Sequence, residues 1–412
     1  MLTTLLLLTA LAAPEPADDV VEDPPILVEA TPTPSTAAEA EATAPEDEPR
    51  ERSEYKWGGI GLPLVNYNNI DGLGFGVGAE VFDRRRDQDT GYRYKVSVAT
   101  FWTTSGNFGS NFLQVERRGK HRMIARLVYR TWRNMLYTGS GGADIALNRD
   151  DIAGDNRIHG PSALINIIRS VPNSPVFVWF QGYTRYVIVN AAPGGILDTD
   201  RPFGFDGGFY FDTSAGIFID EIDRWPLPYK GVQFELDARV GGTAVSGGFE
   251  PLFGVHAELI GYYPVVGKWL TIGMRSVFDK TFGERPWYEQ EYIGGQLRDE
   301  SGYEQTVTGY ARYRPRGDGI SATMIDVRQL LGRTRHPTAD MAFYVSGFAE
   351  MAWVFRKNDP GPPLPSVGFA PTFLWQQAVV LRPFISWGWI AETQGGVRLP
   401  TSQVGISLLG PL

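Results

Sequence analysis

The sequence beyond residue 56 consists largely of stretches of about ten residues in which polar and apolar side chains alternate. In HRMIARLVYR (121–130), three arginines share one face of an extended chain, and Met123, Ala125, Leu127 and Tyr129 share the other. The stretches 91–102 and 231–240 alternate in the same way. No segment reaches the run of about 18 apolar residues that a transmembrane helix needs. The pattern therefore predicts an all-β chain.

Alternation alone is compatible with a soluble β-sandwich or with a membrane barrel, so the connections between strands decide between them. Long connections at 132–160, 190–206, 280–318 and 356–365 alternate with short turns such as SVPNSP (170–175). An even number of strands, with long loops on one side, is typical of outer-membrane barrels. We therefore predict a sixteen-stranded antiparallel transmembrane β-barrel over residues 55–412. The expected strands are 57–66, 71–83, 92–104, 110–118, 121–131, 161–169, 175–189, 207–220, 231–242, 251–262, 268–279, 319–330, 340–355, 366–376, 379–392 and 401–410.

The first 54 residues differ in composition from the rest. Residues 1–13 contain an uncharged apolar run, too short to cross a bilayer, that ends in a small-residue site, and we expect a signal peptide cleaved after Ala12 or Ala13. Residues 14–54 are acidic and rich in Pro and Ala, and we expect a disordered periplasmic linker. This segment carries the acidity of the chain, so the predicted barrel is close to neutral. The expected location is the outer membrane of a Gram-negative bacterium.

Catalytic and metal-binding patterns are missing from the sequence. The chain has no cysteine, its four histidines do not have metal-ligand spacing, and no G-x-S-x-G nucleophile motif occurs. No basic cluster indicates binding to nucleic acid. We therefore expect no enzymatic activity, no cofactor and no metal.

Four stretches in order along the chain resemble motifs of the BamA/TamA-type surface-antigen superfamily. They are LPLVNYNNIDGLGFGVGAEVF (62–82), IDEIDRWPLPYKGVQFELDAR (219–239), FGERPWYEQEYIGG (282–295) and VTGYARYRPRGDG (307–319). The strand SGFAEMAWVF (346–355) is similar to the family's F-x-D-x-G strand, with Glu350 at the acidic position. The resemblance covers the barrel half of that family, without its polypeptide-transport-associated domains.

The resemblance implies a long loop folded into the lumen and paired with Glu350. The loop motif corresponds to Gly294, Gly295, Gly309, Tyr310, Arg312, Arg314 and Arg316. Thr308 stands where the family has the arginine that contacts the acid of strand thirteen. Arg312 or Arg314 is the expected substitute, because a guanidinium can bind a carboxylate through two hydrogen bonds.

Four alternate glycines in the second strand, Gly72, Gly74, Gly76 and Gly78, should share the lumenal face. One interpretation is that this bare surface makes room for the 280–318 loop. The other is that a glycine-rich strand bends to close the barrel.

The first and last strands close a barrel, and the line where they meet is called the seam here. Pro63 in the first strand, and Gly405 and Pro411 in or next to the last, weaken β pairing. The seam is therefore expected to be weak, either as a lateral gate between lumen and bilayer or through fraying of terminal strands.

The expected function is assistance in the insertion or translocation of proteins or lipids at the outer membrane. Expected partners are outer-membrane lipids, lipopolysaccharide, and an unfolded outer-membrane or secreted protein substrate. The alternative is a passive channel or surface antigen without a role in assembly.

Overall fold

The computed structural model describes one β-sheet unit, which lies within Ser53–Leu412. The described residues are 56–68, 72–84, 92–106, 108–119, 121–133, 156–223, 227–245, 248–292, 307, 310, 316–334, 341–356, 359–375, 379–391 and 398–409. The predicted signal peptide and linker lie outside them, as do Gly294, Gly295, Gly309, Arg312, Arg314 and Pro411. Within the described residues no helix is both long and apolar enough to cross a membrane.

Sixteen long strands confirm the predicted number and order. They are β1 (Lys56–Asn68), β2 (Gly72–Arg84), β3 (Tyr92–Thr103), β4 (Phe108–Arg117), β5 (Arg122–Arg133), β6 (Arg157–Ser170), β7 (Val176–Asn190), β8 (Gly208–Asp220), β9 (Gly231–Val245), β10 (Gly248–Val266), β11 (Leu270–Phe282), β14 (Gly319–Thr334), β15 (Met341–Arg356), β17 (Leu364–Trp375), β18 (Val379–Ala391) and β19 (Arg398–Leu409). The described chain also contains the short strands β12 (Glu291–Tyr292), β13 (Arg316–Gly317) and β16 (Asp359–Pro360), and the helices α3 (Ile196–Asp200) and η1 (Trp287–Glu289).

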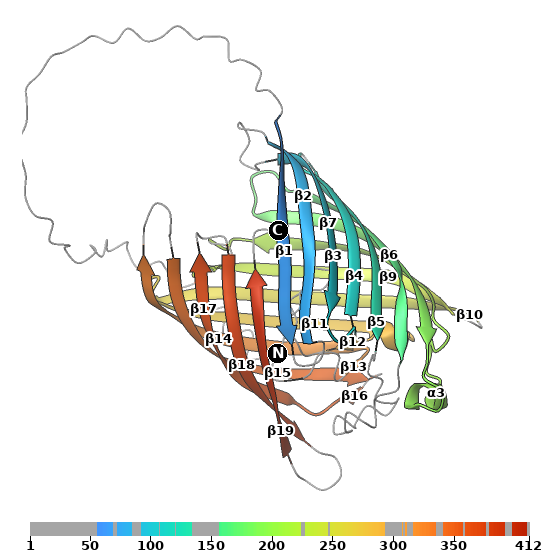
Figure 1. The fold of residues 1–412 in the computed structure, drawn as a ribbon. Helices are drawn as coiled ribbons and strands as arrows, with labels where there is room; N and C mark the ends of the chain where they lie inside the picture. The colour runs from blue at the N-terminus through green and yellow to red at the C-terminus, as the bar shows by residue number, and fades with distance from the viewer. Residues whose placement is uncertain are drawn as a thin grey trace, which may run out of the picture. The chain divides into compact units, whose positions relative to one another are not determined.

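Every long strand pairs antiparallel with its neighbour in the sequence, so the sheet curls around as a barrel (Figure 1). The barrel has two ends. The base is the end at which β1 begins and β19 ends, and the outer end is the one from which the β11–β14 loop leaves. The predicted orientation places the base in the periplasm.

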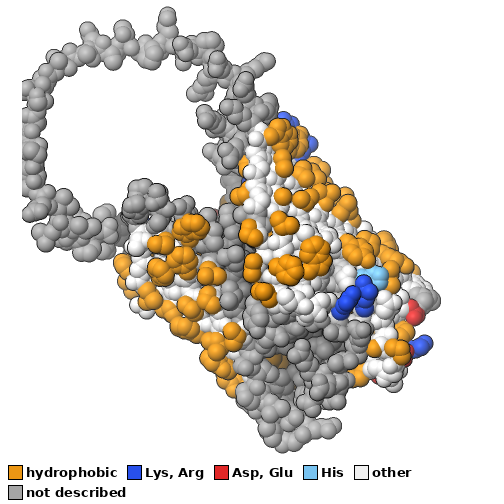
Figure 2. All heavy atoms as spheres, viewed as in Figure 1, with side chains coloured by type: hydrophobic (Ala, Val, Ile, Leu, Met, Phe, Trp, Pro, Cys, Tyr) orange, Lys and Arg blue, Asp and Glu red, His pale blue; other side chains and the backbone are white. Residues whose placement is uncertain are grey.

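The outward face of the sheet is apolar and the inward face is polar, which is the reverse of the arrangement in a soluble protein. Large apolar side chains on the outward face are exposed, for example Leu127 (58%), Val77 (55%) and Ile165 (53%). Polar and charged side chains such as Glu116, Asp237, His256 and Glu258 are buried in the interior. Figure 2 shows this hydrophobic outer surface over β1–β5 and β17–β18. Exposed apolar surface of this extent is stable only against lipid, so the alternation indicates a membrane barrel and not a sandwich.

Interior charges pair with each other between strands that are adjacent or one strand apart. Arg275 Nε lies 2.5 Å from Glu258 Oε1, and Lys95 Nζ lies 3.1 Å from Glu80 Oε1. Arg239 pairs with Asp279, which also contacts His256 Nδ1 at 3.2 Å. These pairs compensate buried charges that would otherwise be costly.

Candidate functional site: the lumenal loop and the seam

The β11–β14 loop, residues 283–318, begins by packing its first turn against the interior of β5–β7. Trp287 and Tyr288 of η1 are buried in a cluster with Trp132, Ile158 and Val187. Leu197 of α3 completes this cluster from the β7–β8 connection, and the backbone N–H of Trp287 donates to Phe203 O at 3.2 Å. The start of the loop is thus fixed by apolar burial on one side of the lumen.

A buried ion pair strengthens this first contact. Arg185 Nη1 of β7 lies 2.6 Å from Glu289 Oε1, with side-chain exposures of 8% and 11%. The same guanidinium lies 4.7 Å from the centre of the Trp132 ring, which gives a cation–π contact. Neither Arg185 nor Glu289 is predicted from the sequence as a site residue, although Glu289 lies inside the stretch 282–295.

The far part of the loop contacts the opposite side of the barrel through Tyr310. Its hydroxyl shares its single hydrogen between Pro365 O (2.8 Å) and Trp389 O (2.9 Å), and its oxygen accepts from the backbone N–H of Trp389 at 3.2 Å. Burial raises the pKa of the Tyr310 hydroxyl, so it stays protonated and able to donate. Tyr310 and Val307 are buried with Ala322, Ala352 and Leu364 of β14, β15 and β17. The loop therefore contacts both sides of the lumen, as the fold prediction requires.

The predicted partner of the loop arginines, Glu350, lies on β15 and is buried. Its Oε2 accepts a hydrogen bond of 2.5 Å from Ser366 Oγ of β17, and its charge acts on Tyr310. Arg312 and Arg314 are outside the described residues, and Arg316 is described only as part of β13, paired with Tyr292. The pairing of an arginine with Glu350 stays a prediction.

Gly74, Gly76 and Gly78 of β2 alternate with residues that are exposed on the outward face, such as Phe75 and Val77. A Cβ atom at Gly74 would lie 2.2 Å from the Phe101 ring, and one at Gly76 would lie 2.2 Å from Thr100 O. In the described part of the chain, the space above Gly74 and Gly76 is thus occupied by Phe101 of β3. At Gly78 a Cβ would meet only ordinary contacts, the nearest at 3.7 Å. Room for the 280–318 loop remains a hypothesis, since much of that loop lies outside the described residues.

The seam is nearly unpaired. Strand β1 pairs with β2 at thirteen positions, but it pairs with β19 at only two, Tyr67 with Ile406 and Asn68 with Gly405. In Figure 1, β1 (blue) and β19 (dark red) overlap along only part of their lengths. The register joins the end of β1 to the last third of β19, so residues 57–66 form a strand edge without a β19 partner among the described residues. Pro63 lies within this edge.

The described residues of the β8–β9 turn at the base of the barrel, 221–223 and 227–230, pack toward the lumen. Asp223 Oδ1 accepts the backbone N–H groups of Tyr229 and Lys230 at 3.3 and 3.1 Å. Gly231 has φ +117°, where a Cβ would lie 2.1 Å from Glu221 O, so the turn requires glycine there. Asp223 and Gly231, both in the stretch 219–239 that resembles the superfamily, thus shape this turn.

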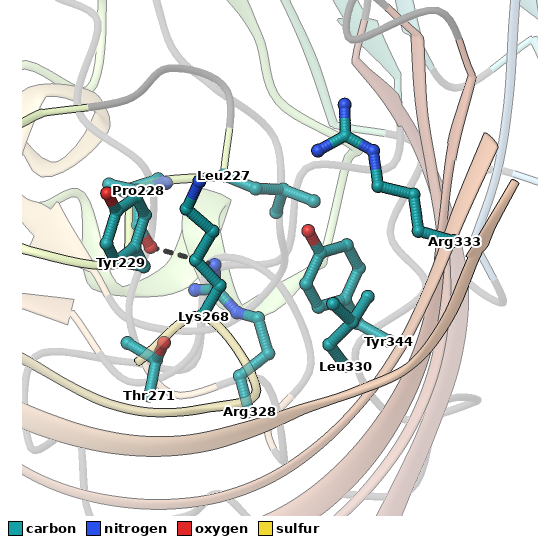
Figure 3. A pocket seen from close by; sticks show the side chains of 9 residues that line it. All are labelled: Leu227, Pro228, Tyr229, Lys268, Thr271, Arg328, Leu330, Arg333 and Tyr344. Carbon is teal, nitrogen blue, oxygen red and sulfur yellow. Dashed lines mark hydrogen bonds between the residues drawn. The ribbon is translucent and has the colours of Figure 1, made fainter. Parts of the chain in front are cut away.

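This turn contacts strands across the base. Arg328 Nη1 of β14 donates to Pro228 O at 3.1 Å, and Leu227 packs on the apolar cluster of Ala342 and Leu374. A small pocket remains between the turn and the barrel wall. Figure 3 shows the basic side chains that line it, Lys268, Arg328 and Arg333, together with Tyr229 and Tyr344. Among the described residues no cluster of three His, Asp or Glu side chains has a geometry suited to a metal ion.

Known structures with the same arrangement of strands are outer-membrane barrels. BamA from Haemophilus ducreyi lacking POTRA domains 1–3 is similar with a TM-score of 0.53 and 12% identity, over 87% of this chain and 70% of that one. CdiB from Acinetobacter baumannii has a TM-score of 0.52 and 14% identity, over 86% of this chain and 60% of that one. CdiB from Escherichia coli has a TM-score of 0.54 and 10% identity, over 86% of this chain and 62% of that one.

Comparison by sequence gives no further relatives, since no family model matches and no curated protein matches. The identities of 10–14% establish the fold alone. This chain spans less than two thirds of the length of the CdiB structures. With its strand order, its polar lumen and its long lumenal loop, the chain has the fold of a BamA-type outer-membrane β-barrel.

Proposed function

We propose that this barrel assists the insertion or translocation of proteins or lipids at the outer membrane. The seam would be the exit route toward the bilayer, and the β11–β14 loop would be the plug of the lumen. No covalent chemistry and no cofactor are needed for this role.

The observation that carries the proposal is the difference in pairing on the two sides of β1. Thirteen residue pairs attach it to β2 and two attach it to β19. A backbone amide without a partner in lipid costs several kcal/mol, so the edge formed by residues 57–66 favours an added strand. An extended substrate segment can supply these hydrogen bonds by β-augmentation.

The lumenal loop supports the same role. Its contacts with β7 through Arg185 and with β17 and β18 through Tyr310 place it across the lumen. A passive channel, the alternative function, needs an open water-filled passage between these walls. The polar lining of the lumen is the observation that favours that alternative.

Depletion of the protein from its host cells tests the proposal. The expected result is a loss of folded, heat-modifiable forms of other outer-membrane proteins, or of lipid from the outer leaflet, before growth stops. If these components stay at their normal level while the purified protein conducts ions steadily in planar bilayers, the passive channel is the correct function.

A further inference from the structure

Two arginines lie directly opposite each other on the outward face of the barrel. Arg133, the last residue of β5, is the register partner of Arg157, the first residue of β6. Their neighbours Trp132 and Ile158 are buried in the lumenal cluster. Because side chains of a strand alternate between its faces, Arg133 and Arg157 point outward, and both are exposed. Figure 2 shows basic side chains and a histidine gathered at one place on this face.

Like charges directly opposite on neighbouring strands destabilise a sheet. The structure gives neither arginine an ion pair with a described carboxylate, and the outward positions of β4–β7 carry no Asp or Glu. Between the two ends of the barrel this face is mostly apolar, and Leu127 and Ile165 are exposed there. The positive charges of Arg133 and Arg157 would therefore be stabilised by an anionic group that does not belong to the described residues of β4–β7.

Further hydrogen-bonding groups lie beside the pair. His159 Nδ1 is 2.9 Å from Tyr129 Oη, and His159 Nε2 is 3.4 Å from Asn190 Nδ2. An amide nitrogen donates, so Nε2 accepts and Nδ1 carries the proton that it donates to Tyr129 Oη. The Tyr129 hydroxyl hydrogen is then left to donate to another acceptor. Asn190 is also the register partner of Arg157.

We propose that Arg133, Arg157 and Tyr129 bind the phosphate of an anionic lipid headgroup in the leaflet at the outer end of the barrel. Two guanidinium groups can hold a phosphate through paired hydrogen bonds. Their place at the rim of the apolar wall matches headgroup depth, and the apolar side chains below them would contact the acyl chains. This site does not depend on the function proposed for the seam.

Native mass spectrometry of the full chain in a neutral detergent tests the site. The probes are lipid A, dephosphorylated lipid A and inorganic phosphate. The double variant R133Q/R157Q should bind lipid A at least about tenfold more weakly than the wild type, equivalent to about 1.4 kcal/mol. The matched control is R117Q/R169Q, which removes two outward arginines at the base, on β4 and β6, and should bind as the wild type does.

Three results would overturn the proposal. The first is equal binding of lipid A and dephosphorylated lipid A by the wild type. The second is a loss of affinity in the control variant as large as that in R133Q/R157Q. The third is displacement of lipid A by inorganic phosphate at equal concentration, which would identify a site for free phosphate instead.

Thermal unfolding provides a second measurement. In neutral detergent Arg157→Gln should raise the unfolding midpoint, because it removes repulsion between like charges, and it should reduce the gain in midpoint that lipid A gives. A lower midpoint in detergent alone would mean that a protein group, such as an aspartate of residues 134–155, already neutralises the pair. That result would contradict a lipid site.

Discussion

Arg185 of β7 and Glu289 of the β11–β14 loop are separated by 104 positions in the chain and are joined by a hydrogen bond of 2.6 Å between Nη1 and Oε1. Both side chains are largely buried. The pair therefore links the barrel wall to the loop that enters its lumen, and its removal should free the loop more than it disturbs the sheet.

Glu289→Gln should destabilise the protein by about 3–5 kcal/mol, because it removes the carboxylate that neutralises the buried Arg185 charge. Urea unfolding in detergent micelles measures this change. The charge exchange R185E/E289R should restore most of the stability. If the exchanged variant is no more stable than Glu289→Gln, the ion pair between positions 185 and 289 does not stabilise the protein.

Tyr310→Phe should release the far part of the loop, at a cost of about 1–3 kcal/mol for the polar groups of Pro365 and Trp389 left without a partner. Limited proteolysis within residues 293–306 measures the release. Tyr186→Phe is the control, since Tyr186 is half exposed on the outer wall. Equal cleavage of both variants would show that the Tyr310 hydroxyl does not hold the loop.

Alkaline pH should act on the same contact. Burial raises the pKa values of Tyr288 and Tyr310 above their ordinary values. The folded state thus favours the protonated hydroxyls, and their contribution is complete below about pH 10, where the unfolded chain begins to titrate. Stability should fall as the pH rises further, and less steeply in Tyr310→Phe. Identical pH profiles for the wild type and this variant would contradict the assignment.

The glycines of β2 should differ in their tolerance of alanine. Gly76→Ala places a Cβ 2.2 Å from the backbone oxygen of Thr100, whereas Gly78→Ala meets nothing closer than 3.7 Å. We expect Gly76→Ala to lower the urea midpoint clearly and Gly78→Ala to change stability by less than about 0.5 kcal/mol. At Gly74 the obstacle is the Phe101 ring, so Phe101→Leu should rescue Gly74→Ala but not Gly76→Ala. Rescue of both would show that backbone proximity does not limit Gly76.

The middle of the outward face of β5 should not tolerate a charged side chain. Leu127 is 58% exposed there, and Leu127→Arg should cost about 2–4 kcal/mol if it lies near the middle of the bilayer. Gln114→Glu is the lumenal control, because it places a charge beside Arg126, which already bonds Gln114 Oε1 at 2.8 Å. Folding titrations in lipid vesicles compare the two. A harmless Leu127→Arg would mean that this face is not in contact with lipid.

The strand order was predictable from the sequence because each strand carries its own alternation. Arg126 and Leu127 face opposite sides of the sheet because adjacent side chains in a strand point to opposite faces. Glycine and proline do not account for the pairing of the seam, because Pro63 lies in the complete ladder between β1 and β2 and Gly405 is one of the two β19 residues that pair with β1. Weakening of the seam by these residues stays a prediction. The register that pairs Tyr67 with Ile406 is the sum of the shifts between all successive strands of the barrel. No single segment of the sequence determines it.

The contacts of the loop were not predictable for a similar reason. The sequence marked 282–295 and 307–319 as loop motifs, but their partners Trp132, Arg185 and Pro365 come from distant strands. The ring of Phe101 over Gly74 likewise follows from pairing between β2 and β3 and not from β2 alone. The resemblance located these segments along the chain, and the fold locates the residues that they contact.

A disulfide across the seam tests the central claim most directly. The variant Y67C/I406C joins the register partners of β1 and β19, and V115C/A125C joins a fully paired strand boundary between β4 and β5 as the control. After depletion of the wild type, the oxidised seam variant should fail to restore other outer-membrane components, and reduction should restore them, while the control should complement in both states. Full complementation by the oxidised seam variant would contradict an exit route that requires β1 and β19 to separate.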